Sequence, residues 1–240
     1  MDSDIPRIIR DFTTGMVHDI QPRTGLKMIE EILKNFKSYF HAERYKDGQF
    51  GYGFRITCAD TGREPIFGFM SATKTIKMVT PKDANVGDLI GITINSFTPM
   101  TAAIVATIYM MFSLEFLRSQ PNNNMLSKLS IPNGFGCTMN IKRRKTEWKN
   151  IPVTVHDKDG NMIKSDMFED VGNSALYSLD LLKPDAELEG VFSGPIILSL
   201  VHFWVKNGQQ VSVNYKVKKI ELHPYKLTSN PLFDLPPKKV

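Results

Sequence analysis

The sequence predicts an α+β protein with an antiparallel β-barrel of the oligonucleotide-binding type, or a β-sandwich, and helices packed against it. Three observations lead to this prediction. Segment 195–222 holds two apolar, β-prone runs joined by Asn207-Gly208, the preferred pair for a two-residue hairpin turn. Segments 24–40 and 98–118 have the composition of helices. Short β-prone segments separated by turn residues make up most of the C-terminal half.

The N-terminal half is expected to begin with a helix and to continue with strands. In 24–40, apolar residues recur at helical spacing, and Thr24 is placed to cap the helix. Residues 50–56 alternate between apolar residues and glycine or arginine, which is typical of a strand. Segment 66–79 is also β-prone, and residues 60–62 supply a turn between these two strands.

Segment 98–118 is predicted to form a helix because Thr98 is cap-like and Pro99 stands at the first helical position. It is apolar nearly all round, which favours a helix buried in the core, with an interfacial membrane or oligomer contact as the alternative. A membrane span needs roughly 20 mostly apolar residues. Only 102–112 is close to uniformly apolar, because Thr101, Thr107, Ser113 and Glu115 interrupt the pattern.

Segment 120–136 is rich in Asn, Gly and Pro and is the most linker-like part of the chain. We expect 1–240 to be one domain with an internal boundary at this segment. The boundary would separate a half with helices and strands (1–119) from a β-rich half (137–228), and an extended tail (229–240) would follow.

The β-rich half is expected to contain strands at 137–142, 151–156 and 161–168, with a turn at Asp159-Gly160. A short helix at 174–182 is the one helical alternative there. In the second strand of the 195–222 hairpin, residues two apart share a face. Val211, Val213, Tyr215 and Val217 should therefore face the core and Lys216 and Lys218 the solvent, with a bulge near 218–220.

The charge of the chain is unevenly distributed. The net charge is +5, but basic residues concentrate in 140–149 and 190–240, whereas 157–189 holds nine acidic residues and three lysines. This distribution indicates a cationic face that could attract a polyanion, although a solvated surface of mixed sign is an equal alternative. The two cysteines, Cys58 and Cys137, lie far apart, and no N-x-S/T sequon is present. We therefore expect an intracellular, reducing location.

Catalytic and metal-binding patterns are not recognisable in the sequence. The five histidines are scattered, and none accompanies a G-x-S-x-G or a cysteine with a matching context. Residues 156–161 resemble the start of a calcium loop, but Phe168 stands where the bidentate Glu is required. Gly51 and Gly53 lie in a strand-like run without a phosphate-loop lysine. The sequence thus predicts no enzymatic activity, no metal and no cofactor.

Binding of single-stranded nucleic acid is the function with most support, because such proteins combine cations that follow the phosphates with aromatic rings on which bases stack. Run 142–149 could instead be a nuclear localisation signal or a membrane-surface patch, and Trp148 could be a half-buried strand residue. The predicted nucleic-acid-binding residues are Lys142, Arg143, Arg144, Lys145, Trp148, Lys149, Trp204, Tyr215, Lys216 and Lys218.

The end of the β-rich half resembles the single-stranded-DNA-binding proteins of poxviruses and other large DNA viruses. The resemblance covers about 189–222 and consists of an apolar strand that ends in HFW, a polar turn, and a strand that reads NYKVKKIEL. It implies an oligonucleotide-binding barrel without enzymatic activity, which coats single-stranded DNA during replication in the host cytoplasm or nucleus. Trp204, Tyr215 and Lys216 match the pattern.

The alternative function is a viral structural protein of the capsid, matrix or movement type that self-assembles and contacts nucleic acid or membrane. The apolar helix at 98–118 and the twelve methionines favour self-assembly. For the first function we expect a homo-oligomer that binds DNA in preference to RNA, contacts replication proteins through the acidic segment 157–189, and does not bind membranes.

Overall fold

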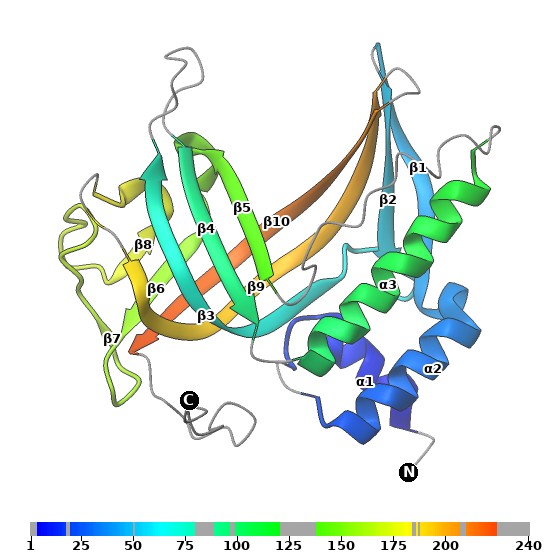
Figure 1. Cartoon of the computed structure of the whole chain (residues 1–240), viewed down its shortest axis with the longest axis horizontal. Helices are drawn as coiled ribbons and strands as arrows, with labels where there is room; N and C mark the ends of the chain where they lie inside the picture. Colours follow the sequence, from blue (N-terminus) through cyan, green and yellow to red (C-terminus); the bar gives the residue numbers. More distant parts are fainter. Residues whose placement is uncertain are drawn as a thin grey trace, which may run out of the picture.

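A computed structural model of the chain describes residues 4–17, 20–49, 51–79, 89–96, 99–120, 138–183, 186, 188–206 and 210–224. Within these residues, three α-helices gather at one end of a long, twisted sheet (Figure 1). The helices are α1 (Ile5–Phe12), α2 (Pro22–Tyr39) and α3 (Pro99–Arg118), and two short 3-10 helices are η4 (Lys145–Trp148) and η5 (Leu179–Leu181). The strands are β1 (Phe40–Gly48), β2 (Gly51–Cys58), β3 (Ile66–Val79), β4 (Leu89–Ser96), β5 (Thr138–Arg144), β6 (Pro152–His156), β7 (Met162–Ile163), β8 (Leu176–Ser178), β9 (Leu188–Lys206) and β10 (Gln210–Pro224).

The predicted α+β class is confirmed. The strands pair in the order β5-β4-β3-β9-β10-β6-β7, with β2 also on β9, β1 on β2, and β8 on β6. Among the described strands, every pair is antiparallel except β6 with β10. The described strands form an open, curved sheet with β5 and β7 at its ends, so a closed barrel is not present among them (Figure 1).

Strands from both sides of the expected internal boundary belong to this one sheet. β4 pairs with β5, and β9 pairs with both β2 and β3, so hydrogen-bonded ladders join the two halves of the chain. Residues 121–136 of the boundary segment and the expected tail at 229–240 lie outside the described residues.

The helix predicted at 24–40 is present as α2, but it begins earlier than predicted. Pro22 starts the first turn after Gln21, and no side chain caps this end, so the prediction that Thr24 is the cap is wrong. Proline is favoured at this position because its missing N–H would have no partner there. Met28, Ile32 and Phe36 form the buried face of α2, against which α1 packs. Helix α1 was not predicted, although Ile5, Ile9 and Phe12 have helical spacing.

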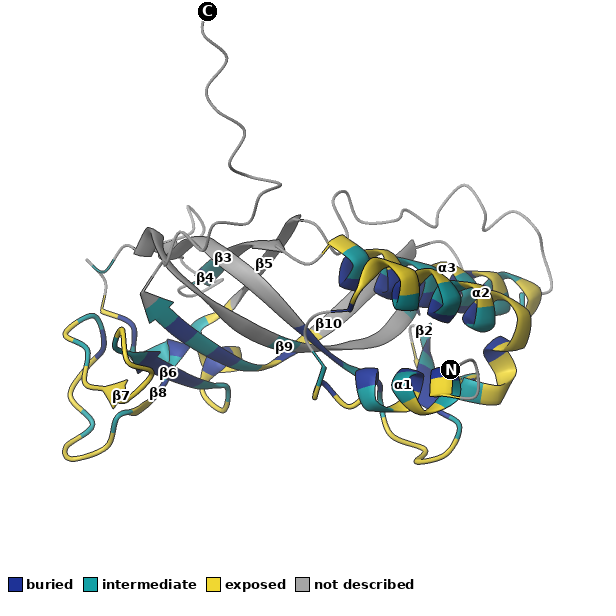
Figure 2. Cartoon of the chain, turned by 90° about the horizontal axis from the view of Figure 1, so that it is seen from below, coloured by how far each residue is buried: buried dark blue, intermediate teal, exposed yellow. Residues whose placement is uncertain are grey.

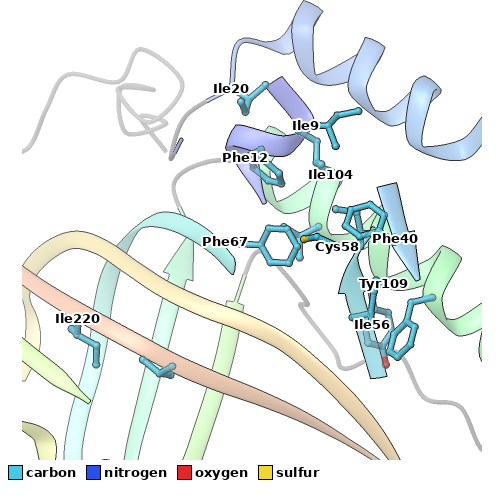
Figure 3. Packing of buried hydrophobic residues seen from close by; sticks show 14 of the residues in the cluster. Ile9, Phe12, Ile20, Phe40, Ile56, Cys58, Phe67, Ile104, Tyr109 and Ile220 are labelled. Carbon is cyan, nitrogen blue, oxygen red and sulfur yellow. The ribbon is translucent and has the colours of Figure 1, made fainter. Parts of the chain in front are cut away.

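Helix α3 is a core helix in this structure, as predicted. It packs along α2 and over β2, where the ring of Phe54 lies 5.5 Å from that of Phe112 and 5.3 Å from that of Phe116. Its buried side chains join those of α1, β2 and β3 in one apolar cluster (Figure 3). By length and composition alone α3 could also cross a membrane, and half of the qualifying window is buried here.

The hairpin predicted at 195–222 is confirmed in its two strands, β9 and β10, which pair from Lys206 opposite Gln210 onward. The Asn207-Gly208 turn lies outside the described residues. The predicted bulge is also present, because the register shifts between Val217 and Lys219. The shift exchanges the faces: Val217 is buried before it, and Ile220 and Leu222 are buried after it.

The β-rich half differs from the prediction in its short elements. Segment 174–182 is not a helix but contains β8 followed by η5, and 161–168 contributes only the two-residue strand β7. Apolar side chains of η4, η5, β6 and β10 are buried together beneath the exposed loops at this end (Figure 2). This part of the core fixes the position of the basic run at 142–149.

Candidate nucleic-acid interface

The basic run 142–149 spans the end of β5 and the 3-10 helix η4. Arg144 and Lys149 are exposed and Lys145 is partly exposed, whereas the side chains of Lys142 and Arg143 lie outside the described part of the structure. Glu147 accepts a hydrogen bond from the backbone N–H of Arg144 at 3.0 Å, which closes this turn. Within the described residues, no carboxylate forms an ion pair with the side chain of Arg144, Lys145 or Lys149.

The position of Trp148 differs from the one predicted for a site residue. Its side chain is 0% exposed, and its Nε1 has no hydrogen-bond partner among the described residues. The ring is part of the core between η4 and η5, because helix η4 turns the chain inward directly after the basic residues. A base cannot stack on a ring without an exposed face, so the prediction that Trp148 is a stacking surface is wrong in this conformation.

Lys216 and Lys218 are exposed, as the strand parity predicted, but they are not free cations. Both amines approach Glu64, the residue before the Pro65–Ile66 entry to β3, at 3.5 and 3.7 Å. One carboxylate therefore offsets part of the charge of the two lysines. The side chain of Tyr215, which was predicted to contact nucleic acid, lies outside the described part of the structure.

The two basic groups lie at opposite ends of β3. Lys216 is opposite Ser199, which is opposite Ile66 at the start of β3. Arg144 is opposite Leu89, which is opposite Val79 at its end. A 14-residue strand at about 3.3 Å per residue is about 43 Å long along its own path. The run 142–149 and the hairpin lysines thus do not form one patch.

Trp204 lies on a face of the sheet where the neighbouring positions on β1 and β2 are glycines. In the ladder Trp204 is opposite Gly53 of β2, and β1 lies on the far side of β2. A Cβ atom on Gly48 of β1 would lie 3.8 Å from Cη2 and 3.9 Å from Cζ2 of Trp204. The partly exposed indole therefore reaches from β9 across β2 toward β1, over positions without side chains.

Tyr45 reaches the same surface from the opposite direction. It lies at a bulge in β1, and a Cβ atom on Gly53 would be 2.2 Å from its Cε1 atom. Tyr45 is 37% exposed as a residue, and its ring rests where the side chain of residue 53 would otherwise be. Tyr45, Trp204, Gly48 and Gly53 make up what we call the aromatic platform.

The aromatic platform faces away from the helices. Phe54 points toward α3, and because side chains alternate along a strand, its neighbours Gly53 and Arg55 point to the opposite face. The guanidinium of Arg55 lies 5.3 Å from the centre of the Tyr45 ring and forms an ion pair with Glu43 at 2.9 Å. Partial burial and the nearby Glu64 carboxylate raise the pKa of Tyr45, so its hydroxyl stays neutral at physiological pH.

The sequence indicated Trp204 as a binding residue but not Tyr45 or Arg55. The signal that could have found them is the pair Gly51 and Gly53, since alternating glycines in a strand mark a close approach by other groups.

A separate group of polar side chains joins β6 to β10, where His156, Glu221 and His223 have donor atoms within 4.8 Å of one another. No known protein-family model matches the chain, and no curated protein sequence gives a significant match to it.

Proposed function

We propose that the protein binds single-stranded nucleic acid without sequence preference, DNA in preference to RNA, and coats single strands during replication. The observation that carries this proposal is the aromatic platform, in which Tyr45 and Trp204 lie on a glycine floor beside Arg55. Every base has a π-face, so rings on an open sheet surface can accept any sequence.

The surrounding charges suit this role. The aromatic platform would take two bases, and Arg55 beside it would meet a phosphate or stack on the face of a base. The carboxylates of Glu43 and Glu64 moderate the attraction near the platform, whereas Arg144, Lys145 and Lys149 at the other end of β3 have none within ion-pair distance among the described residues. A strand that leaves the platform along the sheet would reach these cations.

A purely structural role for the rings is the main competing explanation, since large side chains also cover exposed glycines in sheets. Two substitutions of one residue separate the roles. Tyr45→Leu keeps an apolar side chain over Gly53 but removes the π-face, and Tyr45→Phe keeps the ring and removes only the hydroxyl. Affinity is measured by titration of labelled oligo-dT, oligo-rU and duplex DNA at two salt concentrations.

The proposal expects tight, salt-sensitive binding of oligo-dT, with weaker binding of oligo-rU and duplex DNA. Tyr45→Leu should weaken binding of oligo-dT by about 1–3 kcal/mol, the usual value of one base stacked on a ring, whereas Tyr45→Phe should bind as the parent does. Equal, weak binding of all three nucleic acids by the parent protein would refute the proposal. Unchanged affinity in both variants would remove Tyr45 from the interface.

Self-assembly into a structural array is a second candidate function, favoured by one observation. The helical layer has large apolar side chains whose exposure to water is unfavourable, namely Leu26, Leu33, Met110 and Leu114. Light scattering of the nucleic-acid-free protein tests this function. Filaments or shells that form without nucleic acid would support it, and a monomer or small oligomer that assembles only on oligo-dT would support the first proposal.

A further inference from the structure

The parallel pair of β6 and β10 brings His156 beside Glu221 and His223, which lie far from it along the chain. Glu221 is opposite Thr154, and Ile220 and Leu222 are opposite Val153 and Val155. Those four apolar residues are buried on one face, so Thr154, His156, Glu221 and His223 share the other face. The rings of His156 and His223 are stacked, with centroids 4.2 Å apart and planes 12° apart.

We propose that His156, Glu221 and His223 bind a first-row divalent metal ion of the Zn²⁺ type. Two imidazoles and one carboxylate, without a thiolate, are the ligand set of zinc sites that keep a fourth position open. Such a set favours Zn²⁺ and its neighbours over Mg²⁺ and Ca²⁺, which prefer oxygen ligands. The inference is independent of nucleic-acid binding.

His156 is held in the tautomer that a metal requires. Its Nδ1 lies 3.0 Å from the carbonyl oxygen of Gly160, and since a carbonyl can only accept, Nδ1 carries the hydrogen. The lone pair of the neutral ring is therefore on Nε2, which accepts a hydrogen bond from the hydroxyl of Thr154 at 2.9 Å. A hydroxyl can rotate away, so Nε2 is available as a ligand.

The loop that presents the Gly160 carbonyl is held by its own hydrogen bonds. Oδ1 of Asp157 accepts hydrogen bonds from the backbone N–H groups of Asp159 at 2.8 Å and Asn161 at 2.9 Å. These bonds, together with that from the Asn161 side chain, lower the pKa of Asp157. The Asp157–Asn161 segment is thus an Asx turn whose carboxylate is engaged by its own loop, and its role is to orient His156.

Glu221 is oriented in a similar way. Its Oε1 atom forms an ion pair with Lys219, and its Oε2 atom lies 3.5 Å from Nε2 of His223. Because Lys219 engages Oε1, Oε2 is the oxygen that lies toward the imidazole of His223.

The donor atoms of His156, Glu221 and His223 can reach coordination distance through rotation of the side chains alone. The three donor atoms lie within 4.8 Å of one another. A tetrahedral ion with bonds of 2.0–2.1 Å needs about 3.3 Å between donors. His223 is on the last described residues of β10 and a third of its side chain is exposed, so its ring is able to turn out of the stack toward a shared ion. The bound ion would fasten the arm of β6, β7 and β8 to the long hairpin.

The test is a calorimetric titration of the full chain with ZnCl₂ at neutral pH, with MgCl₂ as the comparison. We expect about one Zn²⁺ per chain and no Mg²⁺ binding. At a hundredfold excess over Kd, Zn²⁺ should raise Tm by about 5 °C or more, and EDTA should reverse the shift. With Co²⁺ in place of Zn²⁺, a tetrahedral site should give visible d–d absorption.

Variants locate the site. His156→Ala and His223→Ala should each abolish saturable Zn²⁺ binding, and Glu221→Gln should weaken it at least tenfold. His41→Ala, which removes an exposed histidine from β1, should bind Zn²⁺ as the parent does. Far-UV circular dichroism checks folding, and if His156→Ala does not fold, His223→Gln decides. Absence of stoichiometric binding, or binding that survives both His223 variants, would overturn the proposal.

Discussion

The two tryptophans have opposite environments, although the sequence places both among basic residues. Trp148 lies within the run 142–149 but is completely buried between η4 and η5, whereas Trp204 lies partly exposed on the aromatic platform. Sequence could not separate them, because burial of Trp148 depends on a 3-10 turn and on η5, which is far along the chain. For Trp204 the alternation of β9 against the glycines of β2 decides the exposure.

We predict that alanine substitutions at these two positions have separate effects. Trp148→Ala should lower the free energy of unfolding by about 3–5 kcal/mol, because it leaves a large cavity in the core. Trp204→Ala should lower the affinity for oligo-dT by about 1–3 kcal/mol with a smaller loss of stability. Urea unfolding and oligo-dT titration of both proteins check this. Weakened binding by folded Trp148→Ala, with unchanged binding by Trp204→Ala, would reverse the assignment.

Gly53 offers a test of the aromatic platform that leaves its rings intact. In Gly53→Ala the new methyl group would overlap the ring of Tyr45, at 2.2 Å from Cε1. Because Tyr45 is exposed, we expect its ring to swing off the sheet at a stability change within about 1 kcal/mol. Affinity for oligo-dT should fall as in Tyr45→Leu. Gly91→Ala is the matched control, since a Cβ atom there meets nothing within 4 Å, and it should bind normally.

At the scale of elements, sequence periodicity predicted the amphipathic helices and strands and missed the strands that have no such pattern. Helix α2 and the β9–β10 hairpin were predictable because buried residues recur every three to four or every two positions. Strand β1 was missed because most of its residues from His41 onward are exposed, so its pattern is polar throughout and pairing with β2 holds it. In 174–182 the apolar spacing fits a helix as well as the observed strand and 3-10 turn.

The contact between α2 and α3 depends on the absence of a side chain at Gly25. A Cβ atom at this buried position would lie 2.1 Å from Cγ and 2.3 Å from Sδ of Met100. We predict that Gly25→Ala lowers the free energy of unfolding by about 1–3 kcal/mol through overpacking. In the double variant Gly25→Ala/Met100→Ala the loss should be smaller than the sum of the single losses. Additive losses in urea unfolding would show that the two residues do not compete for space.

At the scale of the whole molecule, pairing between distant segments creates both candidate sites. The aromatic platform joins β1 to β9 through β2, and the proposed metal site joins β6 to β10. Composition and periodicity describe each strand but not its neighbours, and a sheet whose order departs from the chain order makes neighbours of remote residues. The sequence therefore shows residues of the types that each site needs, but it does not show which of them lie together in the folded protein.

The separation of the two basic groups predicts how affinity depends on oligonucleotide length. An oligo-dT of about 4 nucleotides can occupy the aromatic platform alone, whereas one of about 16 or more can also follow the sheet toward η4. Lys145→Ala/Lys149→Ala removes two cations at that far end. For a single strand each lost phosphate contact reduces the salt dependence of log K by about 0.7, so the double variant should lose about 1.4 with the long oligonucleotide and nothing with the short one. Lys34→Ala/Lys37→Ala, on α2, removes equal charge from the helical layer and should leave both slopes unchanged. An equal loss with both lengths would mean that the cations act only through the general field of the protein.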